Sequence, residues 1–76
     1  MVRAYVLIEM VAGQSRSLVN TLTGMSGVRD VVRVTGPYDV IVVMEGDDLD
    51  QISNFVTDSI HTLKGVARTT TCVSLG

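Results

Sequence analysis

The feature that most limits the possible folds is a repeat, because the chain of 76 residues resembles itself when it is shifted by 38 residues, half its length. Each half contains an apolar run, a stretch with helical spacing, a glycine and a second apolar run. The matched pairs are Leu18 with Val56, Leu22 with Ile60, Met25 with Leu63, Gly27 with Gly65 and Val28 with Val66. Two copies are too few for a solenoid. The repeat therefore predicts one small domain built from two similar β-α-β halves.

The four apolar runs differ in how their hydrophobic residues are spread. Residues 4–11 and 38–45 carry apolar side chains at both odd and even positions, which is typical of strands covered on both faces. Residues 28–35 and 66–75 are diluted by charged and hydroxyl residues, as exposed edge strands often are. We therefore expect residues 4–11 and 38–45 at the centre of a sheet.

Two stretches with helical spacing separate the strands. The first covers about residues 15–25 with Ser15 as its cap, and the second begins near Asp48, where Gln51 three positions later resembles a capping box. Each helix has an apolar stripe that can face a sheet. The stripes are Leu18, Val19, Leu22 and Met25 in the first helix, and Leu49, Ile52, Phe55, Val56, Ile60 and Leu63 in the second.

Glycines place the turns. Gly27 and Gly65 are predicted to end the two helices in a left-handed conformation, and Gly36-Pro37 to turn the chain between the halves. The order β-α-β-β-α-β predicts an α+β, ferredoxin-like fold, a four-stranded antiparallel sheet with both helices on one face. The other face has no cover in the predicted fold, and 46% of the residues are apolar. We expect a second copy to cover it in a two-fold homodimer.

Composition argues against several classes of function. A net charge of −2 with six dispersed basic residues gives no footprint for direct binding of nucleic acid. The longest uninterrupted apolar runs are about five residues, too short to cross a membrane, and a signal region is not evident. The single cysteine cannot form an internal disulfide, so a cytoplasmic location is expected.

Side chains suited to catalysis or metal binding are sparse. Cys72 is interpreted as a small core residue and His61 as a solvent-facing residue near a helix C-terminus, and together they do not make a zinc site. The acidic cluster Asp47, Asp48 and Asp50 lacks the central glycine and the bidentate glutamate of a calcium loop. We therefore expect no enzyme activity, no catalytic residues, no cofactor and no metal.

One pair of segments suggests ligand binding. Residues 36–39, Gly-Pro-Tyr-Asp, place an aromatic ring and a carboxylate at the start of a central strand, and residues 68–71, Arg-Thr-Thr-Thr, add a guanidinium and three hydroxyls. These groups suit a small zwitterion such as an amino acid. A structural interpretation remains open, since Asp39 can accept a turn amide and threonines favour an edge strand.

Three motifs resemble the effector-binding domain of the Lrp/AsnC transcription regulators, also called the RAM domain, for regulation of amino-acid metabolism. They are a Gly-x-Tyr-Asp turn (36–39), a Leu-x-x-x-x-x-Phe helix (49–55) and a Gly-Val-x-Arg-Thr-x-Thr strand (65–71), and the match extends from about Ala4 to Leu75. The resemblance implies a ferredoxin-like fold whose sheets pack face to face in dimers. It also implies larger rings of dimers, often octamers, with amino-acid effectors bound in clefts between dimers.

The resemblance also implies particular ligand-binding residues. These would be Gly36, Tyr38 and Asp39 in the turn, with Thr69 and Thr71 approaching from the last strand. Family members usually carry an N-terminal helix-turn-helix, whereas here Met1 stands directly before the first strand. We therefore expect residues 1–76 to form a single effector-binding domain without a DNA-binding domain.

The leading hypothesis is a non-catalytic sensor in which an amino-acid effector changes the assembly of the domain. It would modulate transcription through assembly with full-length Lrp/AsnC regulators. One alternative is a small ferredoxin-like enzyme, of the cofactor-free oxygenase or isomerase type, which would need a deep pocket with a poised histidine or aspartate. The other is a purely structural oligomerisation module with an empty cleft.

Overall fold

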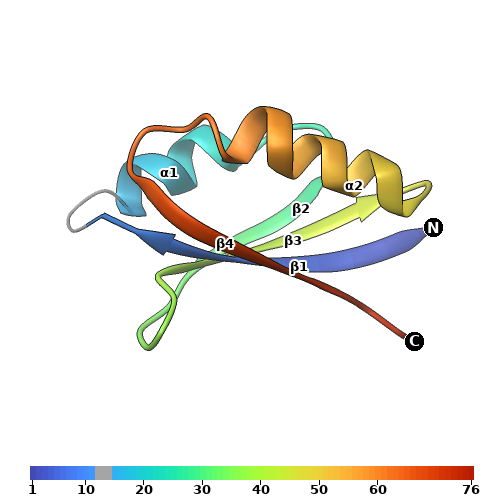
Figure 1. The fold of residues 1–76 in the computed structure, drawn as a ribbon, viewed down its shortest axis with the longest axis horizontal. Coiled ribbons are helices and arrows are strands. Elements are labelled where there is room, and N and C mark those ends of the chain that lie inside the picture. The colour runs from blue at the N-terminus through green and yellow to red at the C-terminus, as the bar shows by residue number, and fades with distance from the viewer. Residues whose placement is uncertain (12–14) are drawn as a thin grey trace.

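The computed structural model describes residues 1–11 and 15–76, which form one sheet with helices on one side (Figure 1). The elements are β1 (Val2–Met10), α1 (Ser15–Leu22), β2 (Val28–Arg33), β3 (Val40–Gly46), α2 (Leu49–Phe55), the π-helical turn η1 (Val56–Ile60) and β4 (Val66–Val73). The strand order is β2-β3-β1-β4, and every neighbouring pair is antiparallel. The predicted ferredoxin-like fold is confirmed, with β1 and β3 at the centre.

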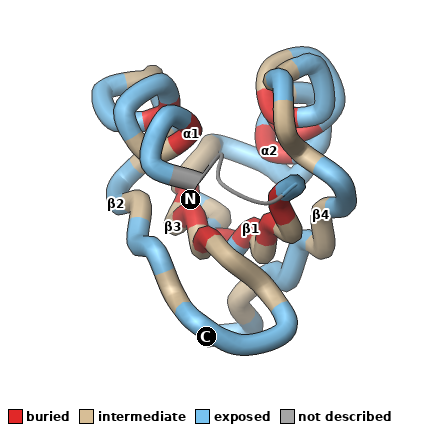
Figure 2. Tube along the Cα trace, turned by 90° about the vertical axis from the view of Figure 1, so that its left-hand side faces the viewer, coloured by how far each residue is buried: buried red, intermediate tan, exposed pale blue. Residues whose placement is uncertain are grey.

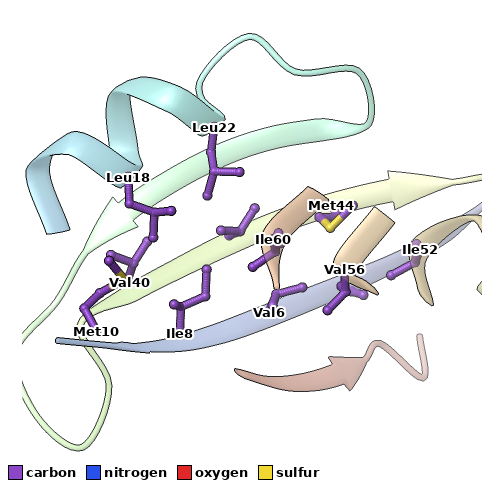
Figure 3. Packing of buried hydrophobic residues seen from close by; sticks show 12 residues of the cluster. Val6, Ile8, Met10, Leu18, Leu22, Val40, Met44, Ile52, Val56 and Ile60 are labelled. Carbon is purple, nitrogen blue, oxygen red and sulfur yellow. The ribbon is translucent and has the colours of Figure 1, made fainter. Parts of the chain in front are cut away.

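The core lies between the sheet and the helices, where Figure 2 shows the buried residues. Alternate side chains of the two central strands face the helices, since Val6 pairs with Val42 and Ile8 with Val40, and all four are fully buried. The helical side of this core consists of Leu18, Leu22, Ile52, Val56 and Ile60 (Figure 3). Leu49, expected in the apolar stripe, is instead 48% exposed, because it is the first residue of α2.

The first helix is shorter than the sequence suggested. It ends at Leu22 and not near Met25, and Gly24 follows with a φ of +92°. Gly24 therefore provides the left-handed backbone that ends the helix, and the prediction that Gly27 does so is wrong. The predicted cap, the side chain of Ser15, lies outside the described residues.

The second helix begins as predicted. Asp48 is its N-cap, and its Oδ1 accepts a hydrogen bond from the backbone N–H of Gln51 at 2.9 Å. The side chain of Gln51 reaches back one residue further than in a capping box, because its Oε1 accepts from the N–H of Asp47 at 2.8 Å. The helical backbone continues through η1 and ends at Ile60, before Leu63.

The repeat is visible in the turns that lead into the edge strands. In residues 25–28 the last N–H donates to the first carbonyl at 3.1 Å, and residues 63–66 make the same bond at 3.4 Å. Gly27 and Gly65 are the third residues of these turns, with φ of +88° and +94°, as a type II turn requires. Both glycines therefore serve turns and do not end helices.

Strands β1 and β4 bring the two ends of the described chain to the same end of the sheet (Figure 1). Ala4 pairs with Val73, and the N–H of Ser74 donates to the carbonyl of Arg3 at 2.8 Å. The connection between β2 and β3 lies at the opposite end, next to Met10.

Candidate functional site

The sheet face opposite the helices, called the open face below, is apolar at its centre. It consists of side chains that alternate with the buried ones, and the described helices leave it uncovered. Its central residues are Tyr5 and Leu7 of β1, Ile41 and Val43 of β3, and Val32 of β2. Tyr5 is 37% and Val32 is 42% exposed. The expectation of apolar residues on both faces of the central strands is thereby confirmed.

Charged side chains border the open face in pairs. The pairs are Arg3 with Glu45 at 2.6 Å, Arg29 with Glu45 at 3.5 Å, and Arg68 with Glu9 at 3.7 Å. The hydrogen bond from Arg3 is the main reason why the pKa of the Glu45 carboxyl lies below its ordinary value. Glu45 is therefore an anion that holds two arginines at one end of this face.

The hairpin that joins β2 to β3, residues 34–39, is anchored by Asp39. The carbonyl of Asp39 accepts from the N–H of Val34, and its own N–H donates to the carbonyl of Ile8, both at 2.9 Å. Its Oδ2 accepts from the N–H of Met10 at 2.7 Å. The structural role considered for Asp39 is therefore present, since one carboxylate oxygen ties the hairpin to the end of β1.

Asp39 also lines an open hollow of about 420 Å³ together with Arg33, Val34 and Thr35. The residues that line the hollow thus include one acidic residue, Asp39 of the hairpin, and one basic residue, Arg33 at the end of β2. Gly36 lies at the exposed tip with a φ of +134°. Arg33 was not among the residues singled out from the sequence, where it looked like one of several charges that dilute an edge strand.

Tyr38 lies on the open face. Its hydroxyl is 3.2 Å from Oγ1 of Thr70, and either group can donate. Tyr38 lies two residues before the start of β3, and Thr70 is on β4, so the side chain crosses β1, the strand between them. Thr70 pairs with Leu7 of the open face, which places the crossing on that side. The sequence singled out the threonine run but not Thr70 as the partner of Tyr38.

The other two threonines lie on the helix side of the sheet, because Thr69 pairs with Ile8 and Thr71 with Val6, both buried beneath the helices. Oγ1 of Thr69 is 2.6 Å from Nε2 of His61, which is exposed as expected. Thr71 is exposed. A single chain therefore does not bring Thr69 and Thr71 together with Tyr38, and their role in ligand binding stays a prediction.

In residues 1–11 and 15–76, three or more His, Cys, Asp or Glu side chains do not gather where they could bind a metal ion. The same ranges contain no helix of the length and hydropathy needed to span a membrane. Cys72 is exposed and pairs with Tyr5 of the open face, so its interpretation as a core residue is wrong.

The sequence profile described as the Lrp/AsnC ligand binding domain matches residues 3–76. The chain belongs to the Lrp/AsnC ligand-binding domain family. Among solved structures, TTHA0845 from Thermus thermophilus is similar, with a TM-score of 0.93 and 32% identity over 100% of this chain and 95% of that chain.

Two further relatives are longer proteins, and this chain matches only part of each. The transcriptional regulator NMB0573 from Neisseria meningitidis, solved as a complex with L-Met, has a TM-score of 0.87 and 19% identity over 99% of this chain and 50% of that chain. This identity supports the fold alone. Homocitrate synthase of Sulfolobus acidocaldarius is 34% identical over 59 residues, which are 78% of this chain and 12% of that enzyme. In both cases the similarity is confined to one segment, and this chain spans half or less of the relative's length.

Proposed function

We propose that this domain is a non-catalytic regulatory module that binds an amino-acid effector and changes its state of assembly in response. The observation that carries the proposal is the hollow beside the hairpin of residues 34–39, which Asp39 and Arg33 both line, in a domain of the Lrp/AsnC ligand-binding family. The L-Met complex of NMB0573 supports an amino acid as the class of effector.

The chemistry of the hollow fits a zwitterion. An amino acid carries an ammonium and a carboxylate, and Asp39 and Arg33 offer the complementary charges. Arg can bind a carboxylate through two parallel hydrogen bonds. One oxygen of Asp39 already holds Met10, so the carboxylate is fixed in direction before an ammonium group arrives, which lowers the cost of ordering on binding. Gly36, Tyr38, Thr69 and Thr71 belong to the proposed ligand-binding set, and because a single chain does not bring Thr69 and Thr71 to Tyr38, the set requires a cleft between dimers.

The open face is the proposed contact between copies. Its centre is apolar, and its border contains three arginines and three carboxylates, counting Asp30 beside Val43. A face whose border charges balance can pack on a second copy of itself without a net electrostatic repulsion, and a two-fold dimer joins one patch to the same patch. We further propose that such dimers form larger rings and assemble with full-length Lrp/AsnC regulators.

The module is proposed to act without catalysis. We propose that residues 1–76 form one effector-binding domain, and the similarity to TTHA0845 over 100% of this chain and 95% of that chain supports this. The enzyme alternative gains little from homocitrate synthase, because the match covers 12% of that enzyme. The close His61–Thr69 pair is exposed, unlike the deep site that such chemistry needs.

The experiment is a thermal melt of the protein with each of the twenty amino acids at millimolar concentration. An effector at about 100 times its Kd stabilises the native state by about 2.7 kcal/mol, which raises the Tm of so small a domain by about 17 °C. The variant Asp39→Asn keeps an oxygen for Met10 but loses the charge, so it should fold and lose the shift. No shift with any amino acid would contradict the proposal and favour a structural module.

A further inference from the structure

Edge strand β4 is tied to the rest of the domain on both sides of the sheet at neighbouring residues. Thr69 contacts His61 of the helical layer at 2.6 Å, and Thr70 contacts Tyr38 of the hairpin at 3.2 Å. The second contact is unusual because Tyr38 belongs to the loop before β3, whereas Thr70 is on β4, and β1 lies between these two strands. The Tyr38 side chain must therefore lie across β1, next to Leu7.

The hairpin also lies on the side where a second copy is proposed to pack. In Figures 1 and 2 the connection between β2 and β3 drops below the sheet, away from the helices. Tyr38 is half-buried there although it belongs to a loop. Its ring is therefore part of the open face, while its neighbour Asp39 lines the hollow with Arg33. Two adjacent residues thus belong to two different surfaces.

We propose that the Tyr38–Thr70 hydroxyl pair is a strap that couples the hairpin to the open face, so that packing of a second copy and the order of the hairpin depend on each other. This rests on the proposed function in one respect, that a second copy covers the open face. Tyr38 and Thr70 are positioning residues in this proposal. Coupling of this kind is reciprocal, so it can be measured from the assembly side without any effector.

Two backbone amides that donate to Asp39 report on the order of the hairpin. The N–H of Met10 donates to Oδ2 of Asp39, and the N–H of Val34 donates to the carbonyl of Asp39. Their hydrogen exchange rates, measured by NMR at low and high protein concentration, report how ordered the hairpin is as the copies associate. The N–H of Met25, bonded to Leu22 on the helix side, serves as the internal reference.

In the native chain, exchange at Met10 and Val34 should slow as association, measured by sedimentation, becomes complete, while Met25 stays constant. In Tyr38→Phe and Thr70→Val this concentration dependence should be lost. At low concentration both variants should exchange about fivefold faster at Met10, the factor for one hydrogen bond of ordinary net strength. Because both variants remove the same bond, the double variant should match either single one.

The matched control is Thr57→Val, which removes an exposed hydroxyl on η1 and should leave every rate unchanged. A concentration dependence that persists in Tyr38→Phe would overturn the proposal, as would additive effects in the double variant. A native chain that remains a monomer would overturn it together with the assembly part of the proposed function. Effector binding is judged separately by the melt, so failure of the strap and failure of the sensor are distinguishable.

Discussion

Replacing Asp39 by alanine should reveal how much of its role is structural. Its Oδ2 accepts from the N–H of Met10 at 2.7 Å, and Met10 is 9% exposed, so little water can replace the lost oxygen. Hydrogen bonds to charged groups contribute about 1.5–3 kcal/mol. We expect Asp39→Ala to lower the free energy of unfolding by about 2 kcal/mol and the Tm by about 10 °C. Asp39→Asn should lose about half as much, since charge-assisted bonds are about twice as strong as neutral ones.

The assay is urea denaturation followed by circular dichroism at one fixed protein concentration, because association of copies adds to apparent stability. The control is Asp58→Ala, which removes an exposed carboxylate on η1 and should change the free energy of unfolding by less than about 0.5 kcal/mol. If Asp39→Ala is as stable as Asp58→Ala, then the Met10 bond contributes no net stability. The role of Asp39 as the anchor of the hairpin would then be refuted.

Three further results are expected. Arg3 lowers the pKa of Glu45 from its ordinary value of 4.5. The stabilisation of the folded state by the ionised Glu45 is therefore present above pH 4.5 and is lost as the pH falls through the lower folded pKa. Acid should reduce the urea midpoint less in Glu45→Gln than in the native chain. A Cβ at Gly46 would lie 2.9 Å from Oε1 of Gln51, so Gly46→Ala should displace this oxygen from the N–H of Asp47 and cost about 1 kcal/mol in the same denaturation assay. In a Gln51→Ala background the same substitution should cost less. Cys72 lies beside the open face, so its labelling by a thiol reagent should slow as the protein concentration rises, and a constant rate would argue against packing on that face.

The fold was predictable because its signals are local and repeated. Apolar residues of both parities identified the central strands β1 and β3, and the capping residue Asp48 marked the start of α2. The end of α1 was harder, since two glycines stand three residues apart and either can adopt a positive φ. Only the hydrogen bonds show that Gly24 follows the helix and Gly27 serves the turn into β2.

The candidate site was less predictable because it depends on pairing between strands distant in sequence. Three successive threonines look alike in a sequence, but the register of β1 with β4 sends Thr70 to the open face and its neighbours to the helix side. A shift of one residue would reverse every one of these assignments. The partner of Tyr38 is therefore fixed by register, which a single sequence does not reveal.

The repeat and the meeting of the chain ends have a consequence for topology. Suppose that a short linker joins residue 76 to residue 1 and that the chain is opened between Gly36 and Pro37. The permuted chain then runs through β3, α2, η1, β4, β1, α1 and β2, again in the order β-α-β-β-α-β. The order of strands in the sheet is also unchanged. If the strands are renumbered along the permuted chain, β3, β4, β1 and β2 become the first to fourth strands. Read from the β4 edge, the sheet then has the order 2-3-1-4, which is the order of the native sheet. Such a permutant would keep the core while cutting the hairpin that contains Asp39, so it would test the proposed effector response separately from folding.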